Sequence, residues 1–445
     1  MTFKPISSAK IIALGFALFI LFGAILLSLP VSSSSGTFTP FFDALYTATS
    51  AVCVTGLIIY DTYSHWSLFG QFVIITLIQV GGMGVVTVAV TLFLLSGKRI
   101  SLKQRTIMRD SISVSQTGGI IKLTGFILRA TVVIELTCAL ILSYRFIPQM
   151  GIEEGLWAGI FHSISAFCNA GFDLMGQYTP FASLVGYVGD PLINIVIIFL
   201  IVTGGLGFLV WNDVLQFGFR FHRYRLQSKI VLMTSGLLIL FPFLFFFFYE
   251  MPQPQYSELT LSERFWASLF QAVSPRTAGF NTIDLVQMSS EAYLVDIVLM
   301  LIGGSPGSTA GGFKTTTFAA LFLCAFCFMK KKDYVEVLGR RLPMHAVANA
   351  VTIVILYISL FICCSLAISI LDKIPLRYSM FECASAIGTV GLSCGVTAQA
   401  GPVSLTILML LMYFGRVGGL TLIYAISREH GPEMSRNPIE QITIG

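Results

Sequence analysis

Four short segments of this sequence each place a glycine after two small or short residues, a pattern that suits cation binding by backbone carbonyl oxygens. They are Val54-Thr55-Gly56, Asn169-Ala170-Gly171, Thr277-Ala278-Gly279 and Thr389-Val390-Gly391. Glycine permits backbone angles that turn carbonyl groups inward toward an axis, and such carbonyls can replace the hydration shell of a potassium ion. A single segment would equally fit a glycine where two membrane helices cross. Four in register favour a shared ion site.

The spacing of these glycines predicts a fourfold internal repeat. Successive glycines are 115, 108 and 112 residues apart. Three copies have a Ser-Ala pair six and five residues before the glycine and an aromatic residue ten before it: Ser50-Ala51, Ser165-Ala166 and Ser385-Ala386, with Tyr46, Phe161 and Phe381. The third copy departs from this pattern, with Val273-Ser274 and Leu269 at the corresponding positions.

A short helix is expected before each glycine segment. Each upstream stretch has about 12 helix-compatible residues, whereas a helix needs about 20 to cross a bilayer. Helix C-termini carry partial negative charge, so four short helices that converge on one axis would favour a cation between them. Extended backbone at membrane depth survives only where protein or a water-filled cavity surrounds it. The pattern therefore predicts four re-entrant pore loops.

The composition predicts an all-α polytopic membrane protein. Of its 445 residues, 55% are hydrophobic and 11% are charged, against about 25% charged in soluble domains. We expect eight full spans in four parallel span–pore-loop–span repeats around a pseudo-fourfold pore. The repeats cover residues 1–100, 101–225, 226–335 and 336–445, the last with a short C-terminal tail. The first span, near residues 11–29, is interpreted as a retained helix rather than a cleaved signal peptide.

Charged residues separate the two sides of the predicted bundle. The connectors between repeats are basic, and the links within repeats are acidic. The basic residues include Lys98, Arg99, Lys103, Arg220, Arg223, Lys330, Lys331, Lys332, Arg340 and Arg341. By the positive-inside rule, both termini and the connectors are cytoplasmic in a multi-pass protein of the cell membrane. The connectors could also bind anionic membrane lipid or a protein partner; nothing in the sequence indicates nucleic-acid binding.

The third repeat is expected to break its second span, whereas the other second spans are expected to be continuous. The interrupting segment is Gly303-Gly304-Ser305-Pro306-Gly307-Ser308-Thr309-Ala310-Gly311-Gly312-Phe313-Lys314. So many glycines, together with a proline, cannot remain helical. The segment begins 24 residues after Gly279, just below the predicted ion site. It is interpreted as a gate, with a hinge or packing defect as the alternative.

Arg416 lies 25 residues after Gly391, at a similar depth. A positive charge below a cation site would form an electrostatic barrier. The arginine could instead bond carbonyls of the glycine-rich segment or form an interhelical ion pair. Two further intramembrane charges, Arg129 and Glu135, are costly in lipid; the sequence leaves open whether they pair with a neighbouring helix or contribute to conduction.

These motifs together resemble the Trk/Ktr/HKT superfamily of potassium transporters, and within it the membrane subunits of the Ktr branch. The resemblance rests on the four loop glycines, the Gly-Gly-Ser-Pro-Gly break and Arg416, and it covers residues 11–426. It assigns the selectivity filter to the four segments quoted first, with potassium held at their backbone carbonyls. It assigns the gate to residues 303–312 with Lys314 and Arg416.

The resemblance also implies how such a protein works. It implies inward, channel-like potassium transport stimulated by sodium, and a homodimer with one pore per subunit. A cytoplasmic ring of RCK-type regulatory subunits, as in Ktr systems, would bind ATP or ADP. This chain itself shows no nucleotide motif, and no bound cofactor is expected.

Two other classes of function compete with a pore. An alternating-access carrier would usually show inverted repeats with broken helices meeting at the midplane, whereas these repeats are parallel. An intramembrane enzyme would need a nucleophile–base pair or a ligand cluster at membrane depth. His162 is the only histidine near one of the loops, so no enzyme is expected.

Overall fold

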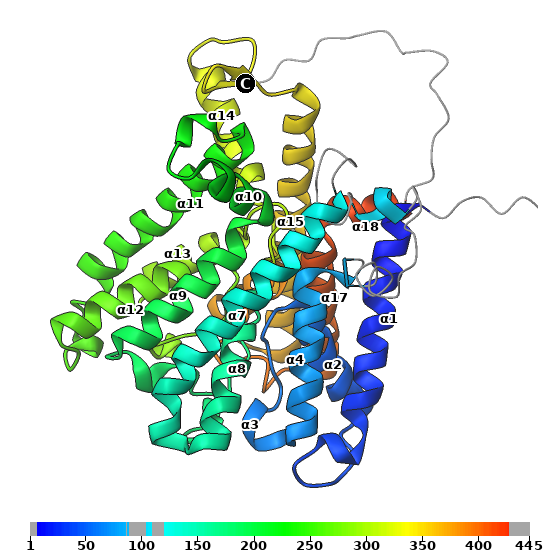
Figure 1. Ribbon diagram of the computed structural model, residues 1–445, viewed down its shortest axis with the longest axis vertical. Coiled ribbons are helices and arrows are strands. Elements are labelled where there is room, and N and C mark those ends of the chain that lie inside the picture. The colour runs from blue at the N-terminus through cyan, green and yellow to red at the C-terminus, as the bar shows by residue number, and fades with distance from the viewer. Residues whose placement is uncertain (1–6, 86, 89–103, 109–119, 427–445) are drawn as a thin grey trace, which may run out of the picture.

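The computed structural model describes residues 7–85, 87–88, 104–108 and 120–426, and it is mostly helical (Figure 1). Parts of the first basic connector and the C-terminal tail lie outside these residues. Three kinds of helix recur along the chain: a long helix, a short helix that ends at one of the glycine segments, and a second helix of similar length to the short one.

Four long helices are apolar enough to cross a membrane. They are α1 (Ser8–Ser28), α7 (Ile120–Met150), α11 (Leu226–Phe245) and α15 (Met344–Asp372). Helix α11 continues as a π-helical turn over Phe246–Glu250. Many of their large apolar side chains are exposed, such as Leu18, Leu140 and Phe241. Such surfaces suit lipid rather than water.

Each long helix is followed by a short one. These are α2 (Phe41–Cys53), α8 (Ile152–Cys168), α12 (Leu261–Val273) and α16 (Leu376–Gly388), with 13, 17, 13 and 13 residues. At 1.5 Å per residue, none reaches the bilayer thickness of about 30 Å. They occupy the positions where the sequence predicts short helices.

The second helices are α4 (Leu68–Met83), α9 (Pro191–Leu206), α13 (Ser290–Leu301) and α17 (Pro402–Val417). They have 12 to 16 residues, so the longest spans about 24 Å. Among the described residues, four helices are long enough to cross a membrane, or five if α9 is counted with α10 (Phe208–Phe217), which is bent by 99° from it. The helical fold is confirmed, and eight full spans remain a prediction.

The expectation that only the third repeat interrupts its second helix is wrong. Helices α4, α9 and α17 stop at Gly84, Gly207 and Gly418, whose φ angles are 86°, 91° and 91°. A glycine with positive φ ends a helix without the steric penalty that a Cβ atom would bring. Each of these glycines closes a Gly-x-x-Gly motif, but in the sequence alone such small residues equally fit close packing of membrane helices. The third repeat is interrupted by a longer segment instead.

Apart from 3₁₀ turns, the remaining elements are α3 (Thr62–His65), α14 (Thr315–Met329), α18 (Gly419–Ile426) and the strands β1 (Glu336–Val337) and β2 (Arg340–Arg341). The two strands form an antiparallel hairpin that the sequence reading missed, with Glu336 opposite Arg341. Its two turn residues, Leu338 and Gly339, both have positive φ, as a two-residue hairpin turn requires.

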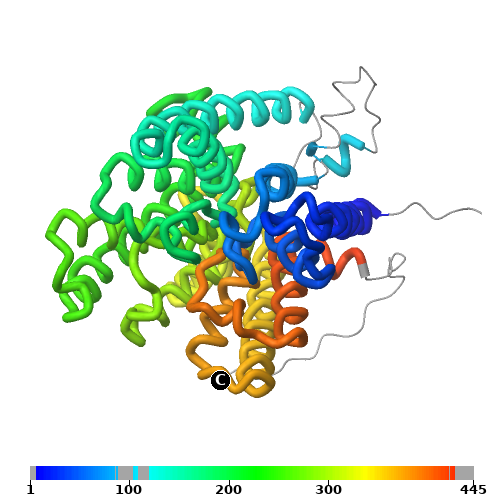
Figure 2. Tube along the Cα trace, turned by 90° about the horizontal axis from the view of Figure 1, so that it is seen from below, coloured from blue at the N-terminus to red at the C-terminus, as the bar shows by residue number. Residues whose placement is uncertain are grey.

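The helices close into a ring of four groups. Each long helix packs on the short helix that follows it, and each second helix packs on the short helix of the next group: α4 on α8, α9 on α12, α13 on α16, and α17 back on α2. In Figure 2 the colours accordingly pass around the centre from blue through green to orange. The four short helices therefore lie around a common centre.

Candidate functional site

The glycine segments begin where the short helices end. Val54, Asn169 and Thr389 are the left-handed C-caps of α2, α8 and α16, and Thr277 has a φ of 70°. The glycine two residues later also has positive φ in every copy, between 69° and 98°. These two turns carry the chain out of the helix and into an extended course, and the second of them favours glycine.

The four glycines meet one another around one axis. A Cβ atom added to Gly56 would lie 3.2 Å from the Cα of Gly171, and one added to Gly171 would lie 2.7 Å from the Cα of Gly279. The corresponding distances are 3.3 Å from Gly279 to Gly391 and 3.1 Å from Gly391 to Gly56. The ring thus closes in chain order. It leaves no room for a side chain, so its centre is lined by backbone.

A serine from each short helix, or from the residue just after it, supports the ring. Ser50 and Ser385 accept hydrogen bonds from the backbone N–H groups of Gly56 and Gly391, both at 3.0 Å. The hydroxyl groups of Ser165 and Ser274 donate to the carbonyls of Phe172 and Phe280. These bonds fix the extended segments against the helices that precede them.

The apparent departure of the third copy is a one-residue shift. Ser274, five residues before Gly279, bonds the residue after the glycine just as Ser165 does. Phe270 is fully buried, as Phe161 is, and takes the aromatic position that had been assigned to Leu269. The third segment is therefore one residue shorter than the others. Because the comparison of sequences counted back a fixed number of residues from each glycine, it missed that Ser274 and Phe270 correspond to Ser165 and Phe161.

Replacing Ser385 with alanine should lower stability, because it leaves the N–H of Gly391 buried without an acceptor. An unpaired buried donor costs about 1–3 kcal/mol, so the thermal unfolding midpoint in detergent should fall measurably. Ser404→Ala is the matched control, since Ser404 is fully buried and its hydroxyl has no partner. Equal shifts in the two variants would contradict the supporting role of Ser385.

On the side of the ring nearest the helix ends, several polar side chains are buried. The side chains of Asn169 and Thr277 lie 3.2 Å apart. The hydroxyls of Thr55 and Thr389 are buried without a hydrogen-bond partner. Thr389 also lies directly against Gly311, where an added Cβ atom would overlap its side chain. The glycine-rich segment of the third repeat therefore reaches the end of the fourth ring segment.

This glycine-rich segment, residues 303–314, is held against the break between α9 and α10. The backbone N–H groups of Ser305 and Thr309 donate to the carbonyls of Gly205 and Gly204, at 3.0 and 3.2 Å. In return, the carbonyl of Gly307 accepts from the N–H of Phe208, at 2.8 Å. Helix ends leave backbone groups without partners, and here the segment supplies them.

The segment leaves the helical path and returns to nearly the same point. A Cβ atom added to Gly303 would lie 3.0 Å from the Cα of Gly312, and the N–H of Gly303 donates to the carbonyl of Phe313 at 2.9 Å. Within the segment, Lys314 Nζ donates to the carbonyl of Ala310 at 2.7 Å. The segment is therefore a closed loop inserted between α13 and α14.

Arg416 joins this loop to the first repeat. Its Nη1 donates to the carbonyl of Thr309, and its Nη2 donates to the carbonyls of Gly81 and Gly82 at 2.5 and 2.8 Å. In the part of the chain that the structure describes, no carboxylate forms an ion pair with it. The predicted bond to loop carbonyls is therefore present, and the electrostatic barrier stays a prediction. The arginine spans groups three, four and one of the ring.

The other intramembrane charges lie apart from the ring. Glu135 is buried and accepts a hydrogen bond from Gln79 Nε2 of α4, at 3.2 Å. It therefore pairs with a neighbouring helix, which was one of the two predicted alternatives. Arg129 is exposed on α7.

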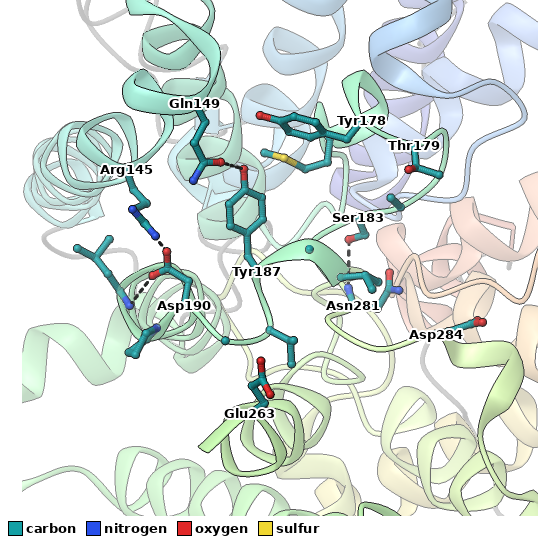
Figure 3. Close-up of a pocket in the computed structure, with 18 of the residues that line it drawn as sticks. Arg145, Gln149, Tyr178, Thr179, Ser183, Tyr187, Asp190, Glu263, Asn281 and Asp284 are labelled. Atoms are coloured by element: carbon teal, nitrogen blue, oxygen red, sulfur yellow. Dashed lines mark hydrogen bonds and ion pairs between the residues drawn. The ribbon is translucent and has the colours of Figure 1, made fainter. Parts of the chain in front are cut away.

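A groove of about 1450 Å³ lies between the end of α7, the link that precedes α9, and the start of α12 (Figure 3). It borders the third ring segment through Asn281, whose N–H donates to Ser183 Oγ at 3.2 Å. Its acidic groups cap nearby backbone: Asp190 caps α9, and hydrogen bonds from Thr260 lower the pKa of Glu263. The groove flanks the ring and does not enter it.

Comparison with known proteins supports a transport role. A family model described as TrkH, cation transport protein, matches residues 11–437. The potassium/sodium uptake protein NtpJ of Enterococcus hirae is 39% identical, covering 99% of this chain and 98% of that protein. Ktr system potassium uptake protein B of Bacillus subtilis is 37% identical, covering 94% and 93%. The crystal structure of the potassium transporter TrkH from Vibrio parahaemolyticus has the same fold, with a TM-score of 0.75 at 19% identity, covering 96% of this chain and 86% of that chain.

The apolar helices and these relatives together define a multi-pass membrane protein that transports cations. More particularly, the chain belongs to the TrkH family of cation transport proteins. The predicted resemblance is confirmed, and so is the expectation of a transporter rather than an enzyme.

Proposed function

We propose that this protein takes up potassium across the cell membrane through a pore along the axis of the glycine ring. The observation that carries the proposal is the ring itself: four segments close in chain order around a centre lined by backbone. The selectivity filter would comprise residues 54–56, 169–171, 277–279 and 389–391. Their carbonyl oxygens would replace the hydration shell of the ion, which then passes by channel-like conduction.

The gate would be the loop at residues 303–312 together with Lys314 and Arg416. Two features support it. The loop touches Thr389 at the inner end of the proposed filter, and Arg416 ties it to Gly81 and Gly82. A loop and a cation in this position would impede an ion leaving the filter. A packing role alone is the alternative, because the same bonds satisfy the ends of α9.

Regulation would come from outside the chain. Relatives include the Ktr system potassium uptake protein B and a potassium/sodium uptake protein, and by analogy we propose a homodimer, stimulated by sodium and controlled by a cytoplasmic RCK-type ring that binds ATP or ADP. The exposed basic residues Arg220, Arg223, Lys330 and Lys331 would face that ring or anionic lipid. With both termini cytoplasmic, the short helices enter from outside.

Purified protein in liposomes should take up rubidium, a potassium analogue, and added potassium should compete better than sodium. The reason is that a carbonyl-lined ring favours the larger, more weakly hydrated ion. Empty liposomes give the background. If uptake appears only after a nucleotide-binding ring is added, the proposed pore still holds and the partner is required for transport. Equal competition by both ions would contradict a potassium filter.

A further inference from the structure

A buried carboxylate lies directly behind one quarter of the glycine ring. Glu382 is on α16, nine residues before Gly391, and is fully buried. The residues at the same position in the first three copies, allowing for the one-residue shift in the third, are Thr47, His162 and Gln271. The fourth copy is therefore the one that places an acid there.

Glu382 is bound to the segment through which the fourth copy leaves the ring. The hydroxyl of Ser393 donates to both carboxylate oxygens, at 2.8 and 3.1 Å. The N–H of Thr397 donates at 3.1 Å, and its hydroxyl donates as well. The backbone N–H is always a donor and the two hydroxyls can donate, so these partners suit an ionised carboxylate. Within the described residues, no cationic side chain pairs with it.

The network extends in two directions from the carboxylate. Ser393 Oγ accepts the N–H of Gly395 at 3.0 Å, which closes the exit segment on itself. The hydroxyl of Tyr46 lies 3.4 Å from Thr397 Oγ1. Tyr46 is on the short helix of the first copy, so the network joins the fourth ring segment to its neighbour. Glu382 thus links the residues that follow the fourth ring segment to the short helix of the first copy.

The other copies lack this arrangement. In the second copy, His162 Nε2 accepts a single backbone N–H, from Leu174, at 3.3 Å. In the third, Gln271 donates to Asp296 of α13 at 2.7 Å rather than to the exit segment. The fourth segment is therefore the one anchored by a carboxyl group, whose hydrogen bonds in the ionised form are about twice as strong as neutral ones.

We propose that Glu382 is a positioning residue that sets the preference of the pore for potassium over sodium. It holds residues 393–397 in place and supplies a fixed negative charge beside the outer end of the ring. This inference rests on the proposed function, since it assumes that the ring is the ion path. A residue that only stabilises the fold would alter the amount of active protein without altering the ion preference.

The test is rubidium uptake by the full-length protein in liposomes, with potassium and sodium as competitors. Glu382→Gln keeps the shape of the side chain and removes its charge, and the potassium-to-sodium preference should fall about tenfold, the effect of losing one charge-assisted bond. Thr397→Val removes one hydroxyl and should act in the same direction, which keeps the test decisive if Glu382→Gln does not fold.

Glu250→Gln is the matched control. Glu250 is also fully buried, and it accepts both the N–H and the hydroxyl of Ser289, but its partner is the start of α13 rather than a ring segment. Its loss should leave the ion preference unchanged. A shift as large as that of Glu382→Gln would overturn the proposal.

The ion preference of Gly391→Ser, measured in the same assay, distinguishes a failure of the Glu382 proposal from a failure of the proposed pore. If Gly391→Ser changes the preference and neither Glu382→Gln nor Thr397→Val does, the role of Glu382 is wrong and the filter stands. If none of these three variants changes it, the ring is not the ion path, and both proposals fail.

Discussion

Rubidium uptake should be abolished when Gly391 is replaced by aspartate. An added Cβ atom at this position overlaps the carbonyl oxygen of Thr55 and lies 3.1 Å from the Cα of Gly56, and the φ of 98° is strained for any other residue. The aspartate also places a carboxylate where the ion must lose its water. Backbone strain alone is of the order of 1–3 kcal/mol, which corresponds to a loss of about fivefold to 150-fold, and the crowding and the added carboxylate increase it.

Gly36 offers a control for this experiment, because it separates crowding from strain. Its φ is also positive, at 68°, but an added Cβ atom meets nothing within 4 Å. We therefore expect Gly391→Ala to lower uptake and Gly36→Ala to retain it in the same liposome assay. Equal uptake by Gly391→Asp and the parent protein would mean that the ion path lies elsewhere.

The ring could be predicted from sequence because it depends on residue type at nearly constant spacing. Only glycine fits where four backbones meet, so Gly56, Gly171, Gly279 and Gly391 stand out in a single sequence. Their closure in chain order follows from the repeat. The supporting serines were visible as a pattern, although the shift at Ser274 hid one of them.

Other features depend on contacts that no local pattern specifies. The breaks at Gly84, Gly207 and Gly418 look like ordinary small-residue packing until the next helix is placed. Glu382 reads as one acid in a short helix, because its partners follow 11 and 15 residues later in an irregular segment. The three acceptors of Arg416 come from two other repeats, and backbone carbonyls leave no mark in the sequence.

Arg416 would hold the proposed gate because of where its acceptors lie. Thr309 belongs to the loop, whereas Gly81 and Gly82 lie at the end of α4. A loop held only by its own ends would be free to leave the axis. A hydrogen bond to a charged group contributes about 1.5–3 kcal/mol, so this link biases the loop toward the position beneath the ring.

Deleting residues 304–311 should raise rubidium flux and weaken control by the regulatory partner. The ends that remain, Gly303 and Gly312, already lie in contact, so the deletion can be joined with little change in the path of α13 and α14. It removes Thr309, and with it the acceptor of Arg416 Nη1. Loss of that bond corresponds to a rise of about tenfold in the open population.

If the loop is a gate, the additional rubidium flux of the deletion variant must pass through the ring. Adding Gly391→Asp to the deletion should therefore return uptake to the background of empty liposomes, which excludes a leak through damaged protein. Arg416→Gln in the intact loop should raise flux in the same direction by a smaller factor. A deletion variant that folds and transports at the parental rate would show that the loop only fills space between the second helices. Flux that rises but survives Gly391→Asp would mean that the deletion opened a path outside the ring.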